Sequence, residues 1–145
     1  MLDPISGDIT LSASFVLQRH SEENVFCQSE LGVSATPRLQ SCNYHWYSVE
    51  TLVNETAWIF MLGFHDGKLE FVSMAPVTEG TSWDSFSVER ERQVAIELQR
   101  TLGAWVGRPP SKHTAAIQRY DFDWGSVSAG LVPQDATASI SVRYN

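Results

Sequence analysis

Residues Ala57 to Pro76 read AWIFMLGFHDGKLEFVSMAP, and this stretch decides the fold class. Two apolar runs flank Asp66-Gly67, a dipeptide that favours a two-residue hairpin turn because both positions tolerate positive φ. On the expected register, one face pairs Phe64 with Leu69, Leu62 with Phe71 and Phe60 with Ser73, and the other face pairs Met61 with Val72 and Ile59 with Met74. Both faces are apolar near the middle, so we expect a central hairpin that is partly covered on both sides.

Strand patterning continues outside this hairpin. Residues 9–17 alternate apolar and polar side chains over their whole length, which predicts one half-buried strand. The other expected strands are residues 25–27, 44–49, 117–124 and 138–144. The stretches 32–43 and 125–135 mix Pro or Gly with small polar residues, so we expect a loop at 32–43 and a loop or a bulged turn at 125–135.

One long helix is expected over residues 87–106. Its apolar face consists of residues at helical spacing, namely Ala95, Leu98, Leu102 and Trp105. Ser87 suits the N-cap position, and Gly107 suits a left-handed C-cap. The order of elements along the chain is strands, then one helix, then further strands. This order predicts a single globular domain over residues 1–145. The fold class is α+β, an antiparallel sheet built from hairpins with one long helix packed on one face.

The charge balance limits the partners. The 145 residues include 17 acidic and 10 basic side chains, which gives a net charge of -7. Phosphate binding requires a basic footprint, so no nucleic acid and no membrane partner is expected. An acidic surface favours a basic protein partner, although solubility alone would also explain it.

The N-terminal residues carry neither a basic region nor an apolar core of a signal peptide. No apolar run approaches the ~18 residues that a membrane span requires. We therefore expect a cytoplasmic protein. In that compartment Cys27 and Cys42 are expected to be free, buried thiols, with a disulfide between them as the alternative.

A metal site was considered at Cys42 and His45, which have a spacing that zinc sites use. A tetrahedral site needs four ligands, and the other candidates, Cys27 and His20, form no second paired motif. We therefore expect no metal and no cofactor. Gly125–Gly130 only loosely resembles a Gly-x-Ser-x-Gly turn, so no catalytic residue is assigned and no enzyme is expected.

Asp121 and Asp123 are expected on the same face of one strand, roughly 6.5–7 Å apart at the backbone. Two carboxylates at this separation could perform acid–base chemistry, bind a cation, contact a protein partner or simply be solvated. Arg119 shares their face, and Arg143 points outward from the strand at 138–144. Asp121, Asp123, Arg119 and Arg143 are therefore our candidate partner-binding residues.

The segment YDFDWGSVSAG at residues 120–130, followed by ASISVRY at 138–144, resembles the tails of small bacterial immunity-type proteins. Those proteins neutralise toxins that are delivered between competing bacteria. The resemblance implies a small, acidic α+β protein that binds a toxin and occludes its active site. It implies no particular site residue.

These observations together predict a protein-binding module, most concretely an immunity protein that blocks a cognate toxin with a basic surface. They are also compatible with a homo-oligomer. One alternative is a small enzyme or ligand-binding domain with a pocket between helix and sheet. Another is a structural or assembly subunit.

Overall fold

The computed structural model describes residues 1–12, 14–77, 88–132 and 137–145. The helices are α1 (Glu23–Gln28), α2 (Glu30–Ser34) and α3 (Val88–Val106). The strands are β1 (Ile9–Ser12), β2 (Phe15–Leu17), β3 (Thr36–Gln40), β4 (Tyr44–Val53), β5 (Thr56–His65), β6 (Lys68–Pro76), β7 (Lys112–His113), β8 (Ile117–Phe122), β9 (Gly125–Val132) and β10 (Thr137–Tyr144).

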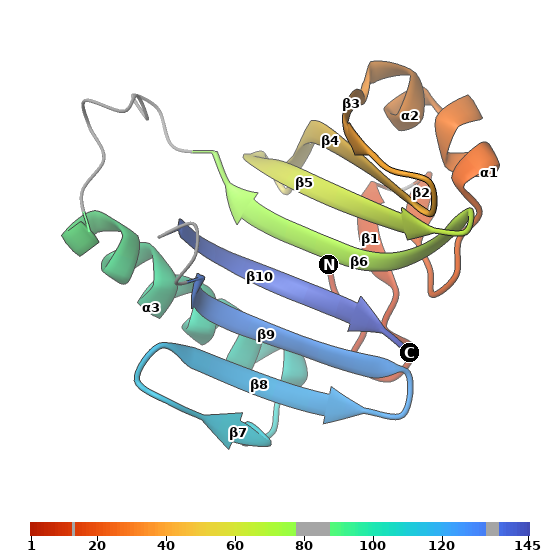
Figure 1. Cartoon of the computed structure of the whole chain (residues 1–145). Coiled ribbons are helices and arrows are strands. Elements are labelled where there is room, and N and C mark those ends of the chain that lie inside the picture. The colour runs from red at the N-terminus through yellow and green to blue at the C-terminus, as the bar shows by residue number, and fades with distance from the viewer. Residues whose placement is uncertain (13, 78–87, 133–136) are drawn as a thin grey trace.

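Eight of these strands form one antiparallel sheet in the order β3-β4-β5-β6-β10-β9-β8-β7 (Figure 1). The sheet consists of two four-stranded meanders, β3 to β6 and β7 to β10. They join at the centre, where β6 pairs with β10 from Met74↔Ile140 to Phe71↔Arg143. Strands β1 and β2 form a separate hairpin. A mostly antiparallel sheet with one long helix confirms the α+β class in this coarse form.

The two faces of the large sheet have different surroundings. Helix α3 contacts β9 and β10, and both α3 and the β1–β2 hairpin lie behind the sheet in Figure 1. We call that side the inner face and the side toward the viewer the outer face. On the inner face, Phe26 of α1 contacts the rings of Tyr47 and Phe64. Leu98 and Leu102 of α3 are also buried in the core, and Trp105 is partly buried.

The Asp66-Gly67 hairpin is confirmed, and it lies in the middle of the sheet as β5 and β6. Asp66 and Gly67 have φ values of 50° and 77°, as a two-residue turn of this kind requires. The expected helix is also present, and Gly107 ends it with φ 71° and an N–H donated to the Gly103 carbonyl. The N-cap prediction at Ser87 lies outside the described residues.

The predicted register of the hairpin is wrong beyond the first two pairs. His65↔Lys68 and Phe64↔Leu69 pair as expected, but Gly63 then faces Phe71, so Glu70 is an extra residue in β6. This bulge shifts every later pair by one position. Leu62 therefore faces Val72, and Phe60 faces Met74. These four side chains lie on the same face of the sheet and are all buried.

The hairpin is covered on both sides, as expected, but the cover is complete on one face and only partial on the other. Phe60, Leu62 and Phe64 point inward and have 0% exposure. On the outer face Ile59 is 38% exposed, while Met61 and Phe71 are partly exposed. The apolar pattern of the outer face therefore belongs to the molecular surface.

The N-terminal predictions need three corrections. The stretch 9–17 is not one strand but the β1–β2 hairpin, in which Ile9, Leu11 and Leu17 are buried. The expected short strand at 25–27 is part of α1, where Phe26 enters the core. The expected loop at 32–43 contains the end of α2 and the edge strand β3, whose five residues are all exposed.

Residues 125–132 form β9 instead of the expected loop, and Trp124 lies in the turn before it. Gly125 has φ 151°, and a Cβ there would stand 2.0 Å from the Arg143 carbonyl oxygen. Glycine thus permits a close approach of β9 to β10, although its local propensity disfavours a strand. The pairing of β9 with both β8 and β10 outweighs that propensity.

Candidate functional site

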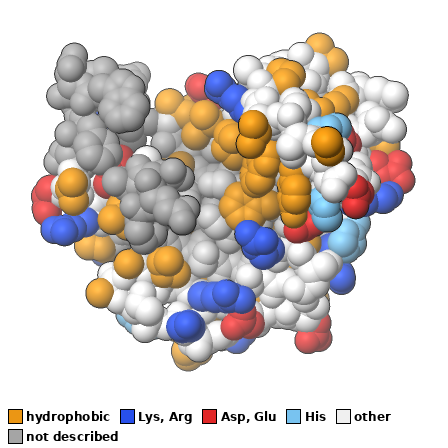
Figure 2. Space-filling model, viewed as in Figure 1, with side chains coloured by type: hydrophobic (Ala, Val, Ile, Leu, Met, Phe, Trp, Pro, Cys, Tyr) orange, Lys and Arg blue, Asp and Glu red, His pale blue; other side chains and the backbone are white. Residues whose placement is uncertain are grey.

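Hydrophobic side chains gather on the outer face of the sheet over β4 to β6 (Figure 2). Strand alternation brings five of them together, and we call this set the aromatic platform. Its members are Tyr44, Trp46, Ile59, Met61 and Phe71. Large exposed apolar patches on a protein surface mark interaction sites more often than isolated apolar residues do.

Trp46 is the central residue of the aromatic platform, and its position depends on Gly63. The two residues are paired across β4 and β5. A Cβ on Gly63 would stand 2.8 Å from Cη2 and Cζ3 of the indole, so a larger residue would push the ring away. The glycine therefore provides the space in which the indole lies against the sheet.

The other rings of the platform fix Trp46 from two sides. The ring of Phe71 meets the indole edge-on at a centroid distance of 5.4 Å. The Tyr44 ring is within 14° of parallel to it, at 6.3 Å. Rings that already pack against one another lose little conformational entropy when a partner binds, so the platform is a preorganised surface.

Arg143 of β10 supplies a cation next to the platform. Its guanidinium lies 5.5 Å from the centroid of the Phe71 ring. Within the part of the chain that the structure describes, no carboxylate lies within ion-pair distance of this arginine. Arg143 is the one sequence-predicted partner-binding residue that lies at this surface.

Glu70, the bulge residue of β6, organises the rim of the platform. Its carboxylate accepts a hydrogen bond from the Tyr44 hydroxyl at 3.1 Å and contacts Nδ1 of His65 at 3.0 Å. The His65 ring stacks on the Tyr44 ring at 4.4 Å. The bond to Glu70 is the main reason why the pKa of Tyr44 is raised above its ordinary value. The hydroxyl therefore stays a neutral donor at neutral pH.

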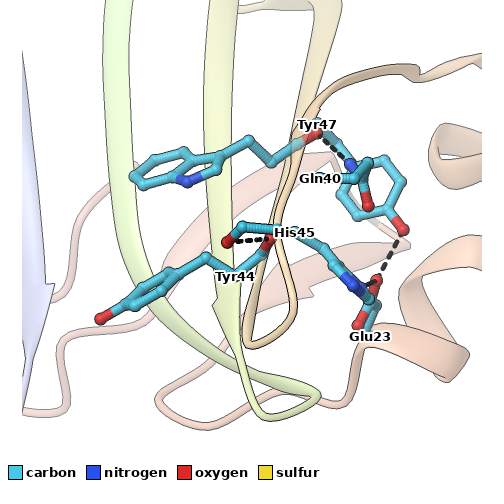
Figure 3. Close-up of polar contacts among 7 residues, drawn as sticks. Glu23, Gln40, Tyr44, His45 and Tyr47 are labelled. Carbon is cyan, nitrogen blue, oxygen red and sulfur yellow. Dashed lines mark hydrogen bonds and ion pairs between the residues drawn. The ribbon is translucent and has the colours of Figure 1, made fainter.

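A second cluster with the same residue types lies on the inner face, as Figure 3 shows. The Glu23 carboxylate accepts a hydrogen bond from the Tyr47 hydroxyl at 2.6 Å and contacts Nδ1 of His45 at 2.7 Å. Burial raises the pKa of Tyr47, and the bond to Glu23 raises it further. Glu23 belongs to α1 and the other two residues to β4, so the cluster holds α1 against the sheet.

The metal candidates are not brought together. Cys42 is exposed before β4, Cys27 is partly buried in α1, and His45 contacts Glu23. Both cysteines are free, and the expectation that both are buried is wrong because Cys42 lies in an exposed turn. Among the described residues, no group of three or more His, Cys, Asp or Glu side chains could hold a metal ion.

The predicted acidic pair is separated by the end of β8. Asp121 lies within β8, whereas Asp123 lies in the turn that follows it, so the two do not share a strand face. Asp121 is not an unpaired acid either, because its carboxylate accepts from Nε of Arg119 at 2.8 Å. Arg119, Asp121 and Asp123 thus lie near one edge of the sheet, and Arg143 lies at its centre.

Sequence reasoning missed Tyr44, Trp46, Met61 and Phe71 as site residues. The signal was present in the aromatic run of residues 44–47 and in the second apolar face of the hairpin. The aromatic run was interpreted only as a strand and the second hairpin face only as partly covered, because an apolar pattern alone does not distinguish a covered face from an exposed one.

A groove of about 440 Å³ lies between α3 and the loop and strand beside it. Arg92, Ile96 and Gln99 line it from the helix, and Ala116 and Leu131 line the opposite side. The amide of Gln99 already donates to the carbonyls of Ala116 and Ala129. Among the described residues that line it there is no acid, histidine or thiol, so this part of the groove offers a binding surface without acid–base groups.

No protein family model matches this sequence, and no curated protein or solved structure is significantly similar to the chain. The resemblance to immunity-type proteins therefore stays a prediction. Of the helices that the structure describes, none combines the length and apolar character needed to cross a membrane.

Proposed function

We propose that this chain is a protein-binding module, most concretely an immunity protein that binds a cognate bacterial toxin and occludes its active site. The observation that carries the proposal is the aromatic platform with Arg143 beside it. Trp, Tyr and Arg are the residue types enriched in the energetic centres of protein interfaces. Here one of each lies on a single exposed sheet face, together with Phe71.

The rest of the fold supports a binding role for this face. Helix α3 and the N-terminal elements cover the inner face, and no helix that the structure describes covers the outer face of β4 to β6. A rigid sheet face blocks an opposing active site by steric occlusion and needs no chemistry of its own. The net charge of -7 would accelerate the approach of a basic toxin surface.

Trp46→Ala tests the proposal directly. The wild-type chain and the variant would each be co-expressed with a candidate toxin domain, chosen from any toxin-bearing gene found directly upstream, and host survival and the Kd would be measured. We expect the variant to lose protection and to bind at least about tenfold more weakly, since central aromatic residues contribute about 2 kcal/mol or more.

The matched control is Ile96→Ala, which removes a 48% exposed apolar side chain from α3, outside the platform. It should protect and bind as the wild type does. A folded Trp46→Ala variant with unchanged affinity would exclude the platform as the interface. If the wild-type chain neither binds the toxin nor protects the host, the immunity proposal fails.

The groove beside α3 favours a second candidate, the ligand-binding domain with a pocket between helix and sheet. Its walls are mainly apolar, and Arg92 is the only charged residue among its lining residues that the structure describes. Such a groove suits a small apolar anion. Arg92→Gln would weaken binding of such an anion and leave toxin binding unchanged, which separates the two candidates.

A further inference from the structure

A second pocket, of about 350 Å³, lies at the end of α3 and away from the aromatic platform. Pro4 and Ile5 form its wall from the N-terminal segment, Val106 and Arg108 form another from the end of α3, and residues 122–124 complete it. It is an open hollow, and its volume lies at the lower end of the about 300–1,000 Å³ that ligand pockets measure.

The aromatic floor of the pocket is fixed in place. The rings of Phe122 and Trp124 stack within 8° of parallel at a centroid distance of 4.9 Å. Trp124 is only 5% exposed, and its indole Nε1 donates to the carbonyl of Pro4 at 3.0 Å. This bond ties the floor to the wall formed by the N-terminal segment.

Arg108 is oriented over that floor. Its guanidinium carbon lies 4.6 Å from the centroid of the Phe122 ring, and Nη2 donates to the backbone carbonyl of Asp121 at 2.6 Å. The Asp121 carboxylate forms an ion pair with Arg119 instead. Arg108 therefore has no acidic partner in the described part of the chain. A guanidinium has five N–H donors, so Arg108 keeps donors for an anion.

Asp123 lines the same pocket with the opposite charge. Its side chain is exposed, and it forms no ion pair with any residue that the structure describes. Its backbone carbonyl accepts from the side chain of Asn145, which holds the turn in place. The pocket therefore combines an apolar floor with one cation and one anion that do not neutralise each other by contact.

We propose that this pocket binds a free α-amino acid with an apolar side chain. The carboxylate meets Arg108, the ammonium group meets Asp123, and the side chain lies against Ile5 and the edge of the Phe122 ring, whose faces are taken by Trp124 and Arg108. A simple anion would be repelled by Asp123, and a simple cation by Arg108. Only a ligand that carries both charges satisfies both residues. This site is independent of toxin binding.

The test uses L-phenylalanine as the probe and the full chain as the protein. Two-dimensional NMR would follow the indole Nε1–H of Trp124 during titration. We expect a saturable shift with a millimolar Kd. 3-Phenylpropionate lacks the ammonium group and phenethylamine lacks the carboxylate, and each should bind at least about tenfold more weakly, because charged hydrogen bonds are lost.

Arg108→Gln and Asp123→Asn should each weaken L-phenylalanine binding at least about tenfold, while both proteins keep the wild-type melting temperature. Arg100→Gln is the matched control, since it removes an exposed cation from α3 outside the pocket. Its Kd should equal that of the wild type.

Absence of a saturable Trp124 shift in the wild type would overturn the proposal. Equal binding of L-phenylalanine by wild type and Arg108→Gln would overturn it as well. If 3-phenylpropionate binds as tightly as L-phenylalanine, the site is a simple anion site and the amino-acid assignment is wrong.

Discussion

Among individual residues, the buried tyrosines show most clearly how polar groups are accommodated. The Tyr144 hydroxyl donates to the Gly7 carbonyl at 2.8 Å, although the residue is only 3% exposed. No buried side-chain nitrogen or oxygen in the described residues lacks a hydrogen-bond partner. The bond from Tyr144 fastens the N-terminal segment to the centre of the sheet, because Tyr144 belongs to β10.

Tyr144→Phe should lower the free energy of unfolding by about 1–3 kcal/mol, because the buried carbonyl of Gly7 loses its donor. Urea unfolding at neutral pH would measure this. Tyr44→Phe is the control, because its hydroxyl lies at the surface and its loss should cost less. If both variants lower the free energy of unfolding equally, the hydrogen bond from Tyr144 to Gly7 stabilises the fold no more than a surface hydrogen bond does.

The same residue predicts a pH dependence. Burial raises the pKa of Tyr144 in the folded state above the ordinary value of about 10. A raised pKa contributes stability that is fully present below about pH 10 and is lost as pH rises toward the folded-state pKa. Tyr144→Phe should therefore show a shallower alkaline loss of stability than wild type, and an identical slope would contradict this.

At the scale of elements, α3 is the part that sequence periodicity predicts best. Its spacing identified Ala95, Leu98 and Leu102, and all three are buried. Trp105, assigned to the same face, is only partly buried near the end of the helix. Val88, at the other end, is 49% exposed. Periodicity thus predicts the middle of a helix face better than its ends.

Leu102→Ala should lower the free energy of unfolding by about 2–5 kcal/mol, because the side chain has 0% exposure and its loss leaves a cavity. Chemical denaturation would measure the change. Gln93→Ala, at an exposed position of the same helix, should change stability little. A Leu102→Ala protein as stable as wild type would contradict the contact of α3 with the core.

Strands were harder to predict because their partners are distant in sequence. The turn at Asp66-Gly67 can be predicted from the local backbone preferences of the two residues. The bulge at Glu70 cannot, because it depends on which side chains pack into the core. Strand β9 contains two glycines and three small residues that disfavour a strand, and its two valines alone do not outweigh them. Its two neighbours decide its conformation, and a single sequence does not show them.

The candidate site follows the same logic. Arg143 was assigned from strand alternation alone, and it does lie beside the aromatic platform. Trp46 and Phe71 were assigned only to strands, because their exposure depends on α3 and the β1–β2 hairpin packing against the opposite face of the sheet. The Phe122 and Arg108 contact was not predicted, since it joins the end of a helix to a strand that begins later in the chain.

At the scale of the whole molecule, the negative charge predicts how a toxin would associate. The Asp121→Asn, Asp123→Asn double variant changes the net charge from -7 to -5. It should fold normally, bind more slowly at low salt and show a weaker salt dependence. Charge steering weakens as the Debye length shortens from about 10 Å at 0.1 M salt to about 3 Å at 1 M. Stopped-flow kinetics would measure both effects.

A Glu89→Gln, Glu97→Gln variant is the matched control, because it removes the same charge from exposed positions of α3. If both double variants slow association equally, net charge alone steers the partner and the β8 edge has no local role. Kinetics identical to wild type at low salt would show that Asp121 and Asp123 do not steer the approach of the partner.

The pairing of β6 with β10 has a consequence for synthesis on the ribosome. Strand β10 is the last of the strands to be translated, yet it occupies the centre of the sheet between β6 and β9. Until it emerges, both of those strands present unpaired backbone edges, which are sites for aggregation. The nascent chain therefore cannot complete its sheet one strand at a time, and we expect folding to be slow because this pairing is non-local.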